Sequence, residues 1–269
     1  MIWLRSLAFA AYFYLLSTLT AFLMLPTLIG PRRWAIWCLR RWSRAVLFGL
    51  RVLCDVRVEM RGLEHVGHGA AFIAAKHQCM LDTIVPFVFM DDGCLVLKKE
   101  LTRIPFYGWY AVRAGMIVVD REAHSAALRK LVADSRHRMA EQRQLLIYPE
   151  GHRMDPGEAP DYKPGVAALY RDLNLPCVPM ATNSGTHWPA HGFLRRPGLV
   201  VFECLEPIPP GLKRAPFMAE LQNRIETASD ALRESGIWAG GPSPPCEAVE
   251  GARHRTDLRP PRPPGPPPG

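Results

Sequence analysis

The pattern of apolar and polar positions divides the chain into an apolar N-terminal stretch, a basic amphipathic stretch and a long alternating region. Residues 7–29 contain no charged side chain, and this run is long enough to cross a bilayer core, which needs about 20 apolar residues. The run is longer than the apolar part of a secretory signal and does not end in a small-residue cleavage site. We therefore predict a retained membrane segment over residues 7–29, with a cleaved signal or a buried core helix as the alternatives.

Residues 32–53 follow with helical periodicity and two unlike faces. One face carries four arginines: Arg33, Arg40, Arg44 and Arg51. The opposite face is apolar and contains Ala35, Cys38, Leu39, Trp42, Val46, Gly49 and Leu53. A basic amphipathic helix with tryptophans is typical of a bilayer interface, where arginines meet lipid phosphates. We expect this arrangement and assign residues 1–55 to a membrane-associated unit; the alternative is a surface helix whose apolar face packs on the folded domain.

The basic residues around the apolar segment are unevenly placed. A single arginine, Arg5, precedes the segment, whereas five follow it closely: Arg32, Arg33, Arg40, Arg41 and Arg44. If the segment spans the bilayer, the positive-inside rule places everything after it in the cytoplasm. A re-entrant or interfacial arm is the alternative, because Pro26 and the Gly30-Pro31 pair permit a turn that keeps both ends on one side.

From Val56 onward, short β-like runs alternate with helical ones. The candidate strands cover residues 56–60, 70–75, 94–97, 116–119, 145–148, 177–181 and 199–204, and the candidate helices cover residues 81–90, 125–141, 165–172 and 216–234. Strands separated by helices of this length predict an α/β domain with a largely covered sheet, which we place at residues 56–236. Residues 237–269 are rich in proline and glycine and cannot bury apolar area, so we predict a disordered tail there.

The charge balance limits the choice of partner. The chain has 33 lysines and arginines against 25 acidic residues, a formal net charge of +8, which favours an anionic partner. Nucleic acid, anionic lipid and phosphorylated metabolites all fit that sign. Nucleic-acid binding is typical of basic residues interleaved with exposed aromatics on a globular domain, but here the densest basic cluster adjoins the apolar segment. We therefore expect membrane lipid as a partner and no nucleic acid.

The cysteine and histidine spacings do not favour a metal site. The seven cysteines are scattered, none has C-x-x-C spacing, and a reducing compartment without disulfides is the natural setting. His187 and His191 have the spacing of a helical metal pair, but Pro189 disrupts the helix that this spacing needs. We expect no metal and predict a loop there, near the mouth of the site.

The first candidate for chemistry lies where the run 70–75 ends. His77 and Asp82 are five positions apart, a spacing that separates side chains by about 140° in a regular helix but lets them meet in a strand-to-helix turn. An aspartate at one ring nitrogen would fix the tautomer and leave the other nitrogen to take a proton from an alcohol. A structural histidine followed by a helix-capping aspartate explains the same pair. A nucleophilic role for Cys79 is disfavoured because no oxyanion motif accompanies it.

A second candidate element follows the run 145–148. The sequence Pro149-Glu-Gly-His-Arg153 forms a loop at the end of a strand, and its glycine and arginine suit a phosphate. Lys163 stands just before a further predicted helix, whose N-terminus also favours anions. Between the two elements, residues 97–109 form a mixed basic and aromatic loop.

These blocks, in this order and at these separations, resemble the glycerolipid acyltransferase family. The matching residues are His77 with Asp82, Lys98 to Gly108 with its Ile-Pro-Phe-x-Gly ending, Pro149 to Arg153, and Val178-Pro179. Other phrases are similar to the bacterial 1-acyl-sn-glycerol-3-phosphate acyltransferases: Arg57 to Gly62, Lys76-His-Gln78, Ile104 to Trp109, Asn183-Ser-Gly185 and Trp188-Pro189. The resemblance covers Arg57 to Ile208 and implies a mixed β-sheet flanked by helices.

The resemblance also implies an activity. A fatty acyl group would pass from acyl-CoA or acyl-carrier protein to the sn-2 hydroxyl of 1-acyl-glycerol-3-phosphate (lysophosphatidic acid), giving phosphatidic acid. His77, oriented by Asp82, would be the general base, with no acyl-enzyme, no metal and no cofactor beyond the acyl donor. The acceptor phosphate would meet Glu150, Gly151 and Arg153, with Arg103, Lys163 and His152 as further candidates and Lys98 and Lys99 as alternative cations. The acyl or acceptor groove would include Lys98, Pro105, Gly108 and Pro179.

The same resemblance implies a location in the bacterial inner membrane, with the catalytic domain on the cytoplasmic side. Two alternatives remain: an acyltransferase for another lyso-lipid, such as a lyso-ornithine lipid or a remodelled lysophospholipid, and a non-catalytic protein that binds anionic lipid through the arginine-rich helix. His152 stands where the family usually has threonine or serine, and Cys79-Met-Leu81 replaces a Ser-aromatic-aromatic run. These departures bear on the identity of the acceptor and on the acyl groove, and neither alters the His77–Asp82 pair.

Overall fold

The computed structural model describes residues 1–120, 124–158 and 160–235. The predicted disordered tail, residues 237–269, lies outside the described residues. Residues 1–238 form one compact unit, and the elements below all belong to it.

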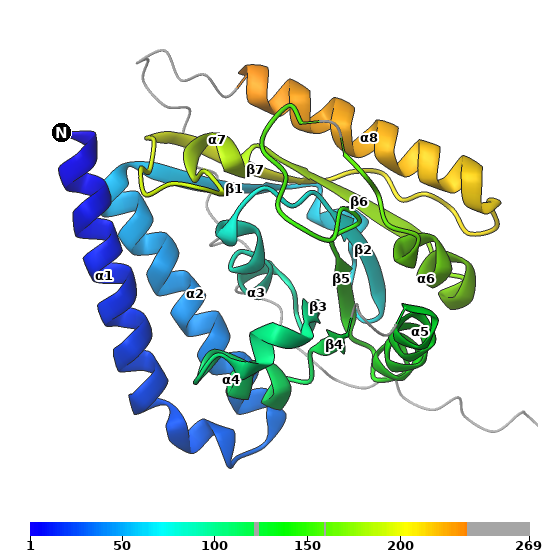
Figure 1. Cartoon of the computed structure of the whole chain (residues 1–269), viewed down its shortest axis with the longest axis horizontal. Coiled ribbons are helices and arrows are strands. Elements are labelled where there is room, and N and C mark those ends of the chain that lie inside the picture. Colours follow the sequence, from blue (N-terminus) through cyan, green and yellow to red (C-terminus); the bar gives the residue numbers. More distant parts are fainter. Residues whose placement is uncertain (121–123, 159, 236–269) are drawn as a thin grey trace, which may run out of the picture. The chain divides into compact units, whose positions relative to one another are not determined.

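A seven-stranded sheet forms the centre of this unit, in the order β1-β7-β6-β2-β5-β3-β4 (Figure 1). The strands are β1 Val56–Arg61, β2 Ala71–Ala75, β3 Gly93–Lys98, β4 Ile117–Val119, β5 Gln144–Ile147, β6 Cys177–Thr182 and β7 Gly198–Cys204. All neighbouring pairs are parallel except β6 and β7, which are antiparallel. The prediction of a mixed sheet is confirmed, and each predicted strand agrees with the observed one to within one residue at either end.

Both faces of the sheet are covered, as expected for parallel strands. On one face Phe72 and Ala74 of β2 pack with α5 (His124–Ala140), α6 (Gly165–Leu173) and α8 (Arg214–Ser235). On the other face Ala71, Ile73 and Ala75 pack in a core shared with the N-terminal helices. β2 is therefore buried along its whole length at the centre of the sheet.

The N-terminal helices form a hairpin that packs against this second face of the sheet (Figure 1). Helix α1 covers Ile2–Leu23, a 3₁₀ turn η1 covers Leu25–Leu28, and helix α2 covers Arg32–Cys54. The guanidinium of Arg113 donates to the carbonyls of Leu28 (2.8 Å) and Gly30, so the turn of the hairpin is fixed to α4 (Tyr107–Arg113).

The apolar face of α2 is covered by protein, so the expectation that it lies in the bilayer is wrong for that face. Ala35, Cys38, Val46 and Leu50 are buried in the same core as the sheet residues. Two arginines of α2 contact the segment directly before β3. Arg32 forms a paired contact with Asp92 (2.6 and 2.7 Å), and Arg40 donates to the carbonyl of Met90 (2.8 Å). The interpretation of α2 as a helix packed on the domain holds.

Helix α1 contacts the rest of the unit near its start, in its middle and near its end, and its buried residues are Ser6 and Phe9. Near its start Trp3 contacts Phe193 at 5.4 Å between ring centroids, in its middle Phe9 meets Trp188 edge-on at 5.4 Å, and near its end Phe22 contacts Phe106 at 4.8 Å. The opposite face is exposed and apolar, with Leu4, Leu7, Leu15, Leu19 and Leu23. Among the described residues, α1 is the one helix long and apolar enough to cross a membrane.

Local interactions alter three of the predicted elements. The predicted helix 81–90 is split into a 3₁₀ turn η3 (Met80–Thr83) and a short helix α3 (Pro86–Phe89), because Pro86 can only begin a helix. The predicted basic loop contains a second 3₁₀ turn, η4 (Lys99–Arg103), followed by α4. A short helix α7 (Ser184–His187) precedes the predicted loop around Pro189.

The packing of α1 makes a stability prediction. Phe9 is 1% exposed and sits against Trp188, so Phe9→Ala should remove about 3–5 kcal/mol from the free energy of unfolding. Thermal unfolding of the detergent-solubilised protein measures the loss. Leu4→Ala is the matched control, because Leu4 is 73% exposed on the other face of the same helix. Equal melting temperatures for the two variants would contradict the packing of α1 on the unit.

Candidate functional site

Three parallel strands at the centre of the sheet bring the candidate residues together. β2 lies between β5 and β6 and is parallel to both, so the carboxyl ends of all three strands meet at one edge. The turn that carries His77 follows β2, the loop Pro149 to Arg153 follows β5, and Ser184 follows β6. Sequence blocks up to 102 positions apart thus form one site.

His77 and Asp82 face each other across the turn after β2. His77 Nδ1 lies 3.1 Å from Asp82 Oδ2. With the proton on Nδ1 the imidazole donates to the carboxylate, and Nε2 is left as the acceptor for an incoming proton. The His77 side chain is 12% exposed and Asp82 is fully buried, so solvent can reach the ring but not its partner.

The carboxylate of Asp82 is held by several donors. Its Oδ2 accepts the backbone N–H groups of Gln78 (2.6 Å) and Cys79 (2.8 Å), and its Oδ1 accepts the hydroxyl of Ser184. The predicted capping role and the predicted contact with His77 therefore belong to the same side chain. Ser184 was not predicted as a site residue, and its place in Asn183-Ser-Gly185 was the signal that could have found it.

The phenol ring of Tyr148 supports the imidazole from one side. The two rings stack at 4.2 Å between centroids with an angle of 24°, and the Tyr148 hydroxyl donates to the backbone carbonyl of Asp82 (2.6 Å). Burial raises the pKa of Tyr148 well above its ordinary value, so the hydroxyl stays protonated and remains a donor. Tyr148 directly follows β5, and the sequence analysis treated it only as the last residue of the predicted strand.

Glu150 does not lie where the resemblance implied. Its side chain is fully buried, with Oε1 2.9 Å from Lys76 Nζ and Oε2 accepting the backbone N–H of His77 (2.8 Å). Burial raises the pKa of Glu150 to about 7, against the attraction of Lys76. A buried carboxylate that repels anions and is already engaged does not suit a phosphate contact, so the geometry places Glu150 beneath the His77 turn.

Beyond Glu150, the side chains of His152 and Arg153 are exposed. Gly151 has φ of 72°, a left-handed conformation that lets the chain reverse after Glu150. His152 Nδ1 lies 3.0 Å from the carbonyl oxygen of Glu150. Burial raises the pKa of Tyr107 and of Tyr148, and the positive charge of Arg153 opposes that rise at both phenols. The Arg153 guanidinium therefore lies near both phenols.

The other predicted cations occupy surface segments. Lys98 ends β3 and Arg103 ends η4, and both side chains are exposed. Lys99 pairs with Asp120 (2.7 Å), and Lys163 pairs with Asp161. The backbone N–H of Lys163 donates to the carbonyl of Pro149 (2.8 Å), which brings its segment, though not its ammonium group, against the Pro149 loop.

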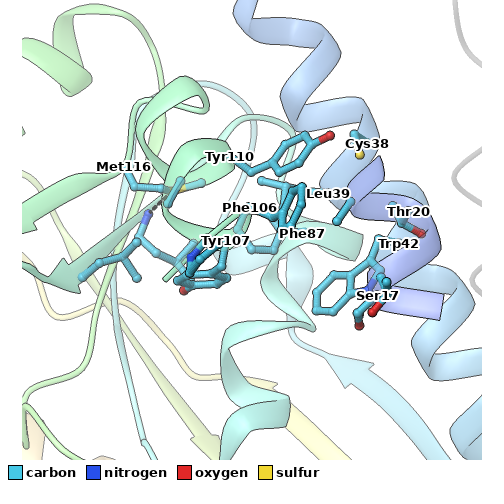
Figure 2. Close-up of a pocket in the computed structure, with 16 residues that line it drawn as sticks. Ser17, Thr20, Cys38, Leu39, Trp42, Phe87, Phe106, Tyr107, Tyr110 and Met116 are labelled. Atoms are coloured by element: carbon cyan, nitrogen blue, oxygen red, sulfur yellow. Dashed lines mark hydrogen bonds between the residues drawn. The ribbon is translucent and has the colours of Figure 1, made fainter. Parts of the chain in front are cut away.

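An apolar cavity of about 280 Å³ lies between the N-terminal hairpin and the sheet. Its lining comes from α1, α2, α3, β3 and α4 and comprises Ser17, Thr18, Thr20, Ala21, Cys38, Leu39, Trp42, Phe87, Leu95, Leu97, Pro105, Phe106, Tyr107, Tyr110, Ala111 and Met116. In Figure 2, Tyr107 and Met116 lie at one side, and Trp42, Ser17 and Thr20 lie at the other. Tyr107 lines the cavity, and its phenol adds to the rise in the pKa of Tyr148, so one end of the cavity lies near the ring that stacks on His77.

The cavity agrees only in part with the predicted groove. Pro105 lines it, whereas Lys98, Gly108 and Pro179 do not. Gly108 is buried against the turn before it, where an added Cβ would come within 2.0 Å of the Thr102 carbonyl oxygen. Pro179 is buried within β6 and pairs in register with Ala74. Helices α1 and α2 supply seven of the sixteen lining residues, a contribution that the sequence analysis did not predict.

Cys79, considered above as a nucleophile, and His187, considered as a metal ligand, are both buried. Burial raises the pKa of the Cys79 thiol well above its ordinary value, which disfavours the thiolate that a nucleophile needs. His187 lies against Gly198, its Nδ1 is 3.0 Å from the carbonyl oxygen of Arg196, and burial lowers its pKa. Within residues 1–120, 124–158 and 160–235, no three potential metal ligands come together.

Comparison with known proteins identifies the family of the chain. A family model described as acyltransferase matches residues 57–183. A 1-acyl-sn-glycerol-3-phosphate acyltransferase of Pseudomonas aeruginosa is 32% identical over 194 residues, which cover 70% of this chain and 76% of that protein. The protein of the same name from Saccharomyces cerevisiae is 26% identical over 219 residues, covering 79% of this chain and 71% of that protein.

A solved structure has the same fold. The crystal structure of the 1-acyl-sn-glycerophosphate (LPA) acyltransferase of Thermotoga maritima matches with a TM-score of 0.71 at 21% sequence identity. The match covers 87% of this chain and 98% of that one, so it includes the N-terminal helices as well as the sheet.

Proposed function

Because the chain belongs to the acyltransferase family, we propose that it transfers a fatty acyl group to the sn-2 hydroxyl of 1-acyl-glycerol-3-phosphate, giving phosphatidic acid. The acyl donor is acyl-CoA or acyl-carrier protein. The observation that carries the proposal is the contact between His77 and the buried carboxylate of Asp82. The relatives from Pseudomonas aeruginosa and Saccharomyces cerevisiae, both named for this reaction, support the choice of acceptor.

The dyad supplies a general base. His77 Nε2 takes the proton of the acceptor hydroxyl as its oxygen attacks the thioester carbonyl, and Asp82 stabilises the imidazolium that forms. Collapse of the tetrahedral intermediate breaks the carbon–sulfur bond, and the imidazolium returns the proton to the leaving thiolate. A thioester is already an activated acyl group, so the reaction needs no cofactor beyond this co-substrate.

Positioning must supply most of the rate. General base catalysis contributes about 10²- to 10⁴-fold, and the remainder comes from holding the hydroxyl and the thioester together. We assign the phosphate of the acceptor to Arg153, the loop cation that acts on both Tyr107 and Tyr148. We assign an acyl chain to the apolar cavity, whose lining residue Tyr107 lies near the same cation.

The packing of α1 indicates how the enzyme meets its lipid substrates. A helix that contacts the unit at Trp3, at Phe9 and at Phe22 cannot stand across a bilayer unless the whole unit follows it. We propose that α1 lies along one leaflet with its leucine face toward the acyl chains, and that both of its ends stay on one side. We place this surface at the cytoplasmic leaflet of a bacterial inner membrane.

The outer face of α2 supports the same orientation. Trp34, Trp37 and Phe48 are exposed there beside Arg41 and Arg44. Tryptophan side chains are enriched at the interface between water and lipid, and arginines bind anionic head groups. The membrane contact predicted for α2 thus falls on a different face of the helix from the one that the apolar periodicity selected.

The proposed reaction is tested by product analysis. Membranes containing the wild-type protein should convert lysophosphatidic acid and labelled acyl-CoA to phosphatidic acid, and a panel with lyso-ornithine lipid and other lysophospholipids identifies the preferred acceptor. His77→Ala should lower kcat by at least about 10³-fold without loss of melting temperature, because it removes the only base of the dyad. His137→Ala, an exposed histidine on α5, should have wild-type activity. Turnover that survives in folded His77→Ala would exclude the mechanism.

The role of Arg153 separates the two substrates. Arg153→Ala should raise the KM for lysophosphatidic acid by about 10- to 100-fold, as expected for loss of a charged hydrogen bond, and should leave the KM for the acyl donor nearly unchanged. Steady-state kinetics with each substrate varied in turn measures the two constants. Arg171→Ala, which removes an exposed arginine of α6, is the control. An unchanged acceptor KM would remove Arg153 from the phosphate site.

The orientation of α1 is tested by topology. An affinity tag placed before Met1 and a tag after Gly269 should both be cut by protease added outside vesicles in which the protein was bound from outside. If α1 spans the bilayer, the N-terminal tag alone is protected. Such protection would contradict the one-sided arrangement, whereas a protein cut at both ends and still bound to the vesicles supports it.

A further inference from the structure

A buried ion cluster lies directly beneath the catalytic turn. The ammonium of Lys76, whose side chain is 2% exposed, is 2.9 Å from Glu150 Oε1 and 2.8 and 2.6 Å from the two carboxylate oxygens of Glu226. The hydroxyl of Tyr162 donates to Glu226 Oε1 (2.9 Å). Glu226 belongs to α8, so this cluster joins the C-terminal helix of the unit to the residue that precedes His77.

The cluster contains more negative charge than the ammonium needs. Burial alone would lower the pKa of Lys76, but Glu150 and Glu226 together raise it above its ordinary value. A single carboxylate would neutralise this ammonium, and the second one adds repulsion: burial raises the pKa of Glu150, and Glu226 adds to that rise. Glu226 contacts the ammonium with both carboxylate oxygens and Glu150 with only one, so Glu226 does most to fix the position of Lys76.

That geometry leads to the backbone of His77. Glu150 uses Oε1 for Lys76 and Oε2 for the N–H of His77 (2.8 Å), so the position of the ammonium determines where the second oxygen lies. The carbonyl of His77 accepts the N–H of Met154 (2.8 Å). Both backbone groups of His77 are thus held by the loop that follows β5, and one of the two depends on the cluster.

We propose that Glu226 is a positioning residue for His77, acting through Lys76 and Glu150, with Tyr162 holding Glu226 in place. It touches neither substrate nor the imidazole. Its effect on turnover rests on the proposed function, but its effect on the backbone of the turn does not.

The test replaces Glu226 by leucine and measures two quantities. The kcat should fall by about tenfold or more, as for loss of a charged hydrogen bond, while the KM of each substrate should change by less than about twofold because no substrate contact is lost. Hydrogen exchange of the peptide that contains the His77 amide should become about tenfold faster or more, because its acceptor is no longer fixed. Glu226→Gln, which keeps one acceptor oxygen for Lys76, should restore part of both.

Glu220→Gln is the matched control. Glu220 lies on the same helix, is half-buried and pairs with Arg224 at 2.6 Å, so this variant loses an ion pair of α8 without touching the cluster. It should have wild-type kcat and wild-type exchange. If Glu226→Leu destabilises the protein too far to assay, the same comparison is made with Glu226→Gln, for which a smaller change in the same direction is expected.

A double-mutant cycle with Glu150→Gln distinguishes positioning from general stability. If Glu226 acts through Glu150, Glu226→Leu should lower kcat much less in the Glu150→Gln background than in the wild type. Full additivity, or unchanged exchange at the His77 amide with unchanged kcat, would overturn the proposal. If the wild type shows no acyl transfer but the exchange accelerates as expected, the proposed function fails and the positioning role stands.

Discussion

The site depends on one buried carboxylate, that of Asp82. It receives backbone donors from its own turn, the hydroxyl of Ser184 from the segment after β6, and the imidazole of His77. A buried charge is tolerated only when its lone pairs are satisfied, so the carboxylate can be buried only where these donors are present. The parallel pairing of β2 with β5 and β6 supplies them, because it brings three strand ends to one edge.

The strands that bring these donors together were predictable from the sequence because they lie at the centre of the sheet. The central strands must be apolar on both faces, so β2, β5 and β6 appear as short apolar runs bounded by turns, and their limits could be placed to within a residue. The His77–Asp82 contact was predictable too, because an aspartate after a strand either caps a turn or orients a neighbour. Here it does both.

The remaining errors have physical reasons. Periodicity shows that α2 has an apolar face but not whether lipid or protein covers it, and here the sheet and α1 do. A motif gives the order of Glu150 and Arg153 but not the direction of each side chain, and a tight turn sends them to opposite sides: one into the interior, the other to the surface. Lys76 and Glu226 are 150 positions apart, and no local pattern marks such a pair.

The shared wall of the apolar cavity has a further consequence. Ser17, Thr20 and Ala21 come from the same helix that presents its leucines outward, so one helix separates the cavity from the surface that we propose to face lipid. Under the proposed function, membrane attachment and substrate selection are then not separable parts of the molecule. A fragment cut back to Val56 would retain His77 and Asp82 but would open the cavity on one side, and under that proposal its choice of acyl chain would no longer be that of the intact protein.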